Sequence, residues 1–195
     1  MDKFLVASHN KKKLKELEDI LRPLGFSVVS PADIEGGIPE PIEDGDTFEA
    51  NALIKARSAC INSGLPAVAD DSGLMVDALN GEPGIYSARY AGTGNADDNN
   101  ALLLKNLQDV PDEKRTARFV SCIACVFPDG REFTVKGFCE GTILRAPKGN
   151  GGFGYDPLFD TKFGCFGELS AEEKNKISHR ANAAAKFSEE IKNYI

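Results

Sequence analysis

The chain has 195 residues, of which 42% are hydrophobic and 27% charged, and its formal net charge is −7. This composition is ordinary for a globular protein with a sizeable core, and we predict a single domain over residues 1–195. The acidic balance excludes a general binder of nucleic acid polymers, which needs a broad basic surface, but it permits a local basic pocket. No apolar run approaches the ~20 residues that span a bilayer, and the first residues lack the apolar region of a signal peptide, so we expect a cytoplasmic protein.

Strand and helix patterns alternate along the first third of the chain. The elements predicted from apolar spacing and from glycine and proline stops are, in order, strand 4–7, helix 11–24, strand 26–29, helix 47–62 and strand 65–69. Leu17 and Ile20 fall on one apolar face of the first helix, and Asp46 or Thr47 caps the second. Residues 34–46 are rich in glycine, proline and acid and predict a long loop.

The later elements add a hairpin. They are predicted to be helix 97–107, strands 118–127 and 132–141, a short helix from residue 170 and a last helix over 178–194. The last helix is expected to bury Phe187, Ile191 and Ile195. We therefore predict an α/β fold with a mixed sheet flanked by helices, and a hairpin-bearing lobe beside the main sheet that leaves a cleft for a ligand.

The cysteines indicate structure rather than chemistry. Five of them, an odd number, fit a reducing compartment. Cys122 and Cys125 match the C-x-x-C pattern, but their spacing within a strand puts the two thiols on opposite faces. Since no second such motif completes a zinc site, we interpret both as small apolar core residues.

Positive charge stands at the start of two predicted helices. Residues 11–13 are all lysine and follow Ser8-His9-Asn10, and His179 and Arg180 follow a cap at Ser178. Cations at a helix N-terminus are unfavourable, because the free N–H groups there already carry partial positive charge. Two such clusters in an acidic chain indicate an anion, with phosphate the first choice. The alternative is two solvated faces with lysines that point into water.

Two adjacent acids follow the apolar strand 65–69. Asp70 and Asp71 begin the sequence Asp-Asp-Ser-Gly, and open α/β sheets bind ligands at strand ends. Desolvated carboxylates need a nearby cation, and Mg²⁺ takes carboxylate oxygens while sharing its remaining ligands with phosphate and water. Glu43, on the acidic loop, is a further candidate ligand. The alternative is a turn in which Asp71 and Ser72 only satisfy backbone groups.

A glycine-rich segment at 147–156 contains a formal G-x-G-x-x-G match. No helix-forming run follows it and no βαβ unit frames it, so we reject a dinucleotide-binding fold. We interpret the segment as a loop that presents Phe153 and Tyr155 as stacking surfaces for a base. The alternative is a surface turn with core aromatics. P-loop and G-x-S-x-G motifs are missing, and two histidines exclude a histidine-rich metal site.

Six blocks, in this order along the chain, resemble the inosine/xanthosine triphosphate pyrophosphatases, a family that removes noncanonical purine nucleotides. The blocks are residues 8–13, Glu43 with 51–56, 69–74, 83–90, 152–157 and 178–180. The resemblance covers essentially the whole chain. It implies an elongated mixed sheet with two lobes around a deep nucleotide cleft, a homodimer, and Mg²⁺-dependent hydrolysis of ITP, dITP and XTP to monophosphate and pyrophosphate.

The resemblance also implies roles for individual residues. Glu43 and Asp71 would hold Mg²⁺, and Asp71 would also accept the proton of the attacking water. Residues 8–13 and Lys55 would contact the phosphates, Phe153 would stack on the purine, and four later residues would line the base end. The implied substrate-binding residues are Ser8, His9, Asn10, Lys11, Lys12, Lys13, Lys55, Ser72, Phe153, Gly154, Tyr155, Asp156, Lys174, His179 and Arg180.

The donors at the base end suit the 6-oxo oxygen of hypoxanthine or xanthine, whereas the 6-amino group of adenine would leave them unpaired. Residues 164–167 and Ala181 depart from the family pattern, and we expect activity to survive both departures. Two alternatives stay open: a pyrophosphatase for other modified bases, such as methylated pyrimidines, and a non-catalytic module that senses nucleotides.

Overall fold

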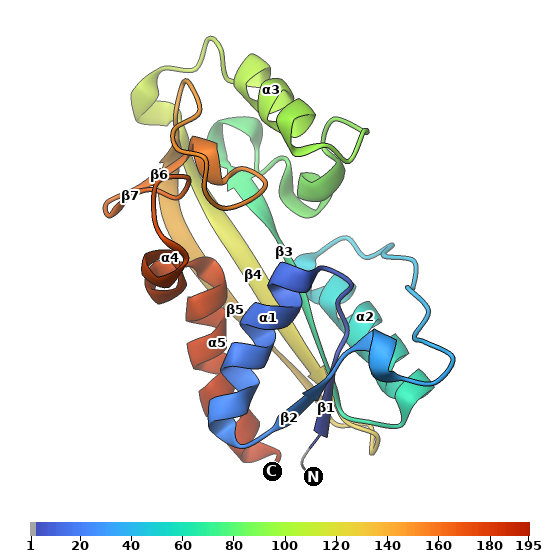
Figure 1. The fold of residues 1–195 in the computed structure, drawn as a ribbon. Helices are drawn as coiled ribbons and strands as arrows, with labels where there is room; N and C mark the ends of the chain where they lie inside the picture. Colours follow the sequence, from blue (N-terminus) through green and yellow to red (C-terminus); the bar gives the residue numbers. More distant parts are fainter. Residues whose placement is uncertain (1–2) are drawn as a thin grey trace. The chain divides into compact units, whose positions relative to one another are not determined.

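The computed structural model describes residues 3–195; the side chains of Lys12, predicted to bind substrate, and Ile20, predicted on an apolar face, lie outside the described residues. One seven-stranded sheet has the order β2-β1-β3-β4-β5-β6-β7 (Figure 1). The strands are β1 (Lys3–Val6), β2 (Ser27–Val29), β3 (Ala67–Val76), β4 (Thr116–Val126), β5 (Glu132–Ile143), β6 (Phe159–Thr161) and β7 (Gly164–Cys165). The helices are α1 (Lys11–Leu21), α2 (Phe48–Ser63), α3 (Ala96–Asn106), α4 (Ala171–Ile177) and α5 (His179–Glu190).

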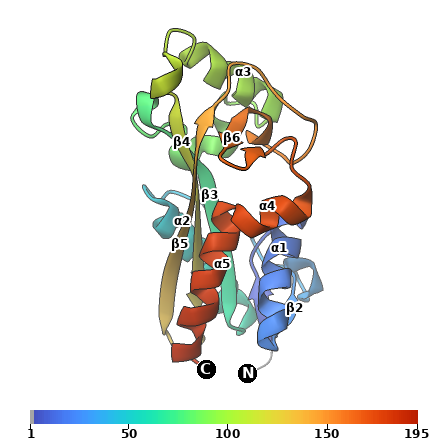
Figure 2. The ribbon, with the colours of Figure 1, turned by 90° about the vertical axis from the view of Figure 1, so that its left-hand side faces the viewer.

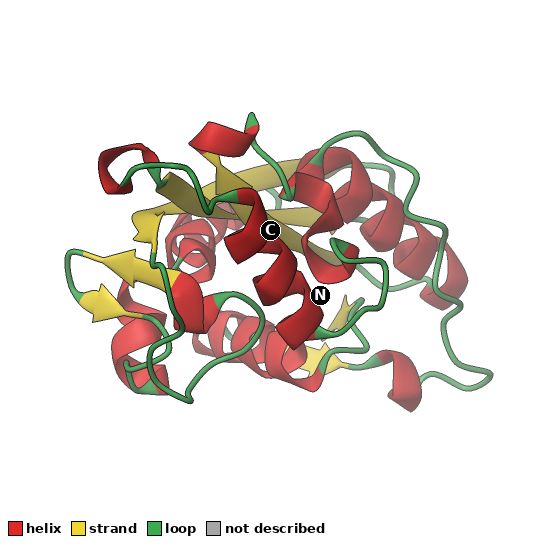
Figure 3. Ribbon diagram, turned by 90° about the horizontal axis from the view of Figure 1, so that it is seen from above, coloured by secondary structure: helices red, strands yellow, loops and turns green. Residues whose placement is uncertain are grey.

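The sheet is mixed, and helices cover both of its faces, which confirms the predicted fold class. β1 pairs in parallel with β2 and β3, whereas β6 pairs antiparallel with β5 and β7. Figure 3 shows helices on both sides of the strands. Within the part of the chain that the structure describes, no helix is both long and apolar enough to cross a membrane.

The predicted helices are confirmed, with small differences at their ends. Thr47, not Asp46, caps α2, and its hydroxyl oxygen accepts the N–H of Ala50 at 3.1 Å. α1 passes into a short 3-10 helix that ends at Gly25 in the left-handed conformation (φ 87°), which glycine adopts without strain. The predicted burial of Ile195 is wrong, because 63% of this residue is exposed.

β3 runs through the acidic sequence instead of ending before it. Its bounds place Asp70 and Asp71 inside the strand, so the predicted strand end and the alternative of a turn are both wrong. β1, by contrast, ends at Val6, which pairs with Val68. The two carboxylates therefore lie just beyond the end of the parallel neighbour β1, and this edge is where open α/β sheets bind ligands.

β4 and β5 form the predicted hairpin, and the N–H of Phe127 donates to the carbonyl of Arg131 at 2.9 Å across its turn. These strands stand between β3 and β6 in the sheet order. The prediction of a hairpin-bearing lobe beside the main sheet is therefore wrong.

The C-x-x-C cysteines are core residues, as predicted. Cys122 and Cys125 are both fully buried in β4, and only Cys125 belongs to the apolar cluster that contains α1. Burial raises the pKa of the Cys122 thiol to about 12, so this thiol stays protonated and unreactive at neutral pH. All five cysteines, each within the described residues, are free.

The chain divides into two compact units. The first contains Met1–Asp71, Ser121–Gly137 and Ala183–Ile195, and the second contains Ser72–Val120 and Phe138–Asn182. In the first unit, α1 and the adjoining part of α5 lie side by side on one face of the sheet (Figure 2). The apolar core of the second unit gathers residues of β4, β5, α3 and the segment after the glycine-rich loop. The single domain and the deep cleft stay predictions.

Candidate active site

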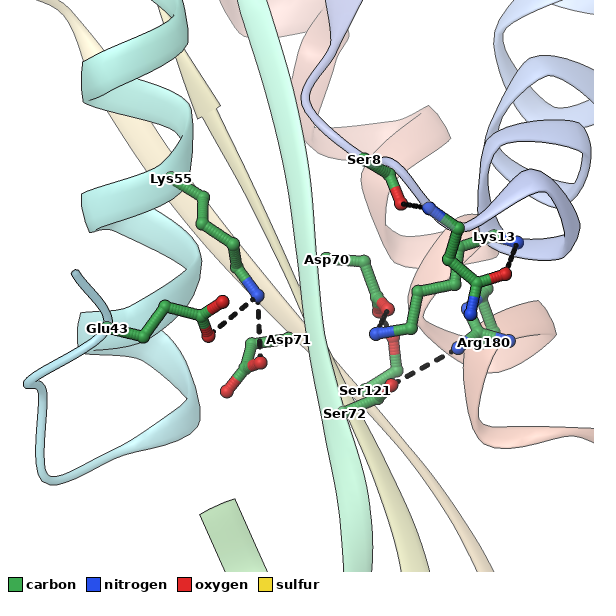
Figure 4. Close-up of polar contacts among 10 residues, drawn as sticks. Ser8, Lys13, Glu43, Lys55, Asp70, Asp71, Ser72, Ser121 and Arg180 are labelled. Atoms are coloured by element: carbon green, nitrogen blue, oxygen red, sulfur yellow. Dashed lines mark hydrogen bonds and ion pairs between the residues drawn. The ribbon is translucent and has the colours of Figure 1, made fainter. Parts of the chain in front are cut away.

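The two adjacent acids of β3 face opposite sides of the sheet, because successive side chains of a strand alternate. Asp70 points toward α1 and Asp71 toward α2 (Figure 4). They therefore belong to two separate clusters of the first unit rather than to one pair of carboxylates.

On the α1 face, Asp70 is the centre of a buried ion pair. Lys13 Nζ lies 3.0 Å from Asp70 Oδ2, and the side-chain exposures are 19% for the lysine and 0% for the aspartate. The hydroxyl of Ser121, on β4, donates to Asp70 Oδ1. Both carboxylate oxygens thus have partners, and the carboxylate fixes the direction of the Lys13 ammonium group. Sequence reasoning missed Ser121, whose only signal is a polar residue at a buried strand position.

The residues before α1 form a cap. Asn10 Oδ1 accepts the backbone N–H of Lys13 at 3.3 Å, and Ser8 Oγ accepts the N–H of Asn10 at 3.2 Å. The cap fixes the start of the lysine-rich helix, as predicted, and the ion pair of Lys13 with Asp70 places this start beside β3. The cap fixes the Asn10 side chain at the helix start, and its amide N–H groups are donors of the kind that suits a phosphate oxygen.

Other residues of the same block lie nearer to solvent. His9 Nδ1 is 2.8 Å from Glu40 Oε1, and both side chains are more than half exposed. Lys11 is exposed as well. The structure therefore brings Lys13, but not His9 or Lys11, into a buried contact with the acids of β3.

On the α2 face, one lysine joins two acids. Lys55 Nζ lies 2.9 Å from Asp71 Oδ1 and 3.1 Å from Glu43 Oε2. Asp71 Oδ2 is buried and has no hydrogen-bond partner among the described residues. Burial alone would lower the pKa of Lys55, but the two ion pairs outweigh it and raise that pKa. Burial raises the pKa of Asp71, although Lys55 opposes the shift.

The acidic loop that carries Glu43 is tied to α2. Asn51 is buried, and its Oδ1 accepts the N–H of Gly45 at 2.9 Å. A Cβ atom at Gly45 would lie 2.7 Å from the Cβ of Ala50, so only glycine permits this close approach. By holding Gly45, Asn51 helps to place Glu43 next to Lys55. The sequence shows that Asn51 and Lys55 share a helix face, but it does not show the bond to the loop.

The donor set on the α2 face fits a hard divalent cation. No group of three or more metal-ligating side chains occurs among the residues that the structure describes. Mg²⁺ does not need one, because it commonly takes one or two carboxylates and completes its coordination with water and phosphate oxygens. Glu43 and Asp71 converge on the same ammonium group, and Asp71 keeps one buried oxygen without a partner.

In the second unit, a buried ion pair supports the glycine-rich loop. Lys174 Nζ lies 2.5 Å from Asp156 Oδ2, and both residues are buried. The same oxygen accepts the N–H of Phe153 at 2.8 Å. Lys174 Nζ also lies 4.7 Å from the centre of the half-buried Phe153 ring, a cation–π distance.

Tyr155 belongs to the core rather than to a stacking surface. It is 4% exposed, and its hydroxyl donates to the carbonyl of Ser87 at 2.8 Å. Burial raises its pKa. The alternative of a core aromatic is therefore confirmed for Tyr155, and the prediction that its ring stacks on a base is wrong. Phe153, by contrast, is half-buried.

The second basic helix start is buried, not a solvated face. Ser178 Oγ accepts the N–H of Ala181 at 3.1 Å, as a cap does. His179 and Arg180 are 4% and 3% exposed. The His179 ring stacks on Phe119 at 4.8 Å, and Arg180 donates to Ser72 Oγ at 3.2 Å. The structure thus brings together Ser72 and Arg180, which lie far apart in the sequence.

The fold and these clusters define an open-sheet α/β protein with phosphate-type donors beside two acids in one unit and polar groups around an aromatic ring in the other. The sequence matches the Ham1 family model over residues 4–190, and the chain belongs to this family.

Known relatives support this assignment over nearly the whole chain. A dITP/XTP pyrophosphatase of Corynebacterium efficiens is 51% identical over 193 residues, covering 93% of each chain. One of Geobacter sulfurreducens is 51% identical over 188 residues, covering 95% of this chain and 94% of that protein. The structure of a HAM1 protein from Coxiella burnetii has a TM-score of 0.90 at 38% identity and covers 99% of this chain and 100% of the other. The resemblance found from the motifs is confirmed.

Proposed function

We propose that this chain hydrolyses noncanonical purine nucleoside triphosphates, namely ITP, dITP and XTP, to the monophosphate and pyrophosphate with Mg²⁺ as cofactor. The observation that carries the proposal is the α2-face cluster, in which Glu43 and Asp71 meet at Lys55 and Asp71 Oδ2 has no partner among the described residues. The names of the relatives contain two of these substrates, dITP and XTP. A cytoplasmic homodimer is part of the proposal.

The α2-face cluster supplies the catalytic groups. Glu43 and Asp71 hold the metal ion, and Mg²⁺, when bound, would neutralise negative charge on the phosphate oxygens. Asp71 Oδ2 takes a proton from the water whose oxygen attacks the α-phosphorus, while the bond to the bridging oxygen breaks and pyrophosphate leaves. Since burial raises the pKa of Asp71, its carboxylate is a stronger base than an exposed one.

The start of α1 and Lys55 bind the phosphates. Lys13 provides a cation whose direction Asp70 fixes, and Asn10 provides amide N–H groups beside the helix N-terminus. Ser8 shapes the turn that places both of them. His9, Lys11 and Lys12 add positive or polar groups at the rim.

The second unit recognises the base. Phe153 stacks on the purine, while Lys174, His179 and Arg180 offer donors that suit a 6-oxo oxygen, and Asp156 holds Lys174 in place. Ser72, Gly154 and Tyr155 contact the substrate around this ring, the last two through their backbone groups. An adenine 6-amino group would leave buried donors unpaired, which is a strong basis for discrimination.

The test incubates the purified protein with Mg²⁺ and ITP, XTP, GTP, ATP or dTTP in ¹⁸O-labelled water and identifies the products. We expect pyrophosphate and monophosphate, mainly from ITP and XTP, with the label in the monophosphate, because attack at the α-phosphorus puts the water oxygen there. Label in pyrophosphate would mean attack at the β-phosphorus. Orthophosphate with diphosphate would mean attack at the γ-phosphorus, and either result contradicts the mechanism.

The same assay separates the alternatives. Turnover of methylated pyrimidine triphosphates with little turnover of ITP would indicate a pyrophosphatase for other modified bases. ITP binding without turnover of any substrate would indicate a sensing module.

A further inference from the structure

Buried side chains hold the loop that carries Phe153 at two neighbouring backbone groups. Asp156 Oδ2 accepts the N–H of Phe153 at 2.8 Å, and Asn100 Nδ2, on α3, donates to the carbonyl of Gly154 at 3.1 Å. The Cα atoms of Phe153 and Gly154 both lie between these two groups. Fixing both restricts rotation of the Phe153 backbone, and therefore the direction of its ring.

The loop needs such tethers because it is built from glycines, which have the greatest backbone freedom. Gly152 and Gly154, on either side of Phe153, have φ values of 75° and 61°. A Cβ at Gly152 would lie 2.1 Å from Asp156 Oδ2, so the close wrapping of the chain around this carboxylate requires glycine there. Without tethers, the same glycines would let the ring turn away.

A buried asparagine at position 100 is energetically unfavourable unless its side-chain N–H donor has a function. It is 8% exposed, and its Oδ1 is buried without a hydrogen-bond partner among the described residues. Together with Phe153 and the glycine-rich loop, it lines a cavity of about 500 Å³. An apolar side chain would avoid the unmet acceptor, since burying a polar atom without a partner is unfavourable. Among the described residues, the hydrogen bond to the carbonyl of Gly154 is the contact that explains an amide at this position.

We propose that Asn100 is a positioning residue that holds Phe153 in the direction in which its ring stacks on the purine. The inference rests on the proposed function for the identity of the stacked ring, but the restraint of Phe153 itself does not. Asn99, the preceding residue, serves a different segment, because its Nδ2 donates to the carbonyl of Ala88 at 3.2 Å.

The chain contains no tryptophan, so F153W places a single tryptophan at the loop, whose fluorescence can be excited selectively at wavelengths that tyrosine does not absorb. In this background, N100D keeps the shape of the side chain and removes the N–H donor, and N100L also removes the unpartnered oxygen. N106A is the matched control, because Asn106 lies on the same helix and donates from an exposed position to the hydroxyl of Tyr90 at 2.8 Å. Fluorescence anisotropy is measured without nucleotide, and quenching is then measured with inosine monophosphate.

We expect N100D and N100L to lower the anisotropy and to weaken nucleotide affinity about tenfold, the effect of one lost hydrogen bond, while N106A changes neither. Unchanged anisotropy in a folded Asn100 variant would overturn the inference. If N100L does not fold, N100D alone provides the test. If neither variant folds, Asn100 supports the fold rather than the loop, and the inference is overturned. Failure of inosine monophosphate to bind F153W itself would contradict the proposed function and leave the anisotropy result standing.

Catalysis gives an independent readout. N100D should lower kcat/KM for ITP mainly through KM, and it should add no further loss in an F153A background, because the residue then has no ring to position. Additive losses in the double variant would show that Asn100 acts by another route, against the inference.

Discussion

Asp70 and Asp71 are neighbours of the same type on one strand, yet their surroundings differ. Asp70 is fully buried and both of its oxygens have partners, Ser121 and Lys13. Asp71 has Lys55 at one oxygen and, within the described residues, no hydrogen-bond partner at the other. Asp70 thus has a partner at each oxygen, whereas Asp71 has a partner at one oxygen within the described residues.

This difference separates a residue that positions from a residue that reacts. A carboxylate with a buried partner at each oxygen gains less from a metal ion or a proton, whereas a buried oxygen without a partner is unfavourable in the absence of a ligand. Stability and catalysis should therefore depend on opposite members of the pair.

The largest expected effect is on turnover. D71N removes the proposed proton acceptor and should lower kcat by roughly 10³-fold, within the range for general bases. Because burial disfavours the ionised form of Asp71, stability should stay the same or rise slightly. Steady-state kinetics and urea unfolding measure the two effects. Near-full turnover with intact nucleotide binding would show that the base is another group.

The next effect is on stability. D70N leaves Lys13 largely buried without its counter-ion and should lower the free energy of unfolding by about 3 kcal/mol, as the loss of one partner of a buried pair does. S121A, which removes only the hydroxyl donor to Asp70, should cost about 1 kcal/mol. Urea denaturation measures both. If D70N were no more destabilising than D71N, the contrast between the two acids would fail.

A smaller effect concerns the metal. E43Q removes one carboxylate of the α2-face cluster and should raise the Mg²⁺ concentration for half-maximal activity roughly tenfold, a scale seen for changes around metal ligands. D44N, at the adjacent exposed acid of the same loop, is the control and should change little. Binding of Mn²⁺ followed by electron paramagnetic resonance checks the affinity without turnover. An equal shift in both variants would indicate general charge rather than a ligand.

The smallest effect comes from an ion pair near the surface. Arg57 Nε lies 2.8 Å from Glu132 Oε2 and donates to it, and this bond lowers the pKa of Glu132 below its usual 4.5. The pair therefore stabilises the fold above that pH and loses this contribution as the pH falls through the lower folded pKa. E132Q should cost at most about 1 kcal/mol at pH 7 and less at pH 3, because exposed pairs are screened by solvent. Thermal unfolding at both pH values measures it, and a larger loss at pH 3 would contradict this sign.

Much of the site was predictable because its residues occur in compact motifs. The start of α1 with its run of lysines and the cap at Ser178 follow from local spacing. The bounds of β3 were not predictable, because aspartate, serine and glycine are poor strand formers. Its place between β1 and β4 in the sheet extends this strand through the acids.

The sequence by itself determined the order of the helices and of strands β1 to β5, the family, and which residue types stand in each motif, since these depend on periodicity, caps and glycine positions. Only the tertiary structure decided that Asp70 and Asp71 face different helices and that Ser121 and Asn100 serve residues distant in the chain. The physical reason is that these side chains contact residues on neighbouring strands, helices and loops, and the local sequence does not specify which element packs beside a given residue.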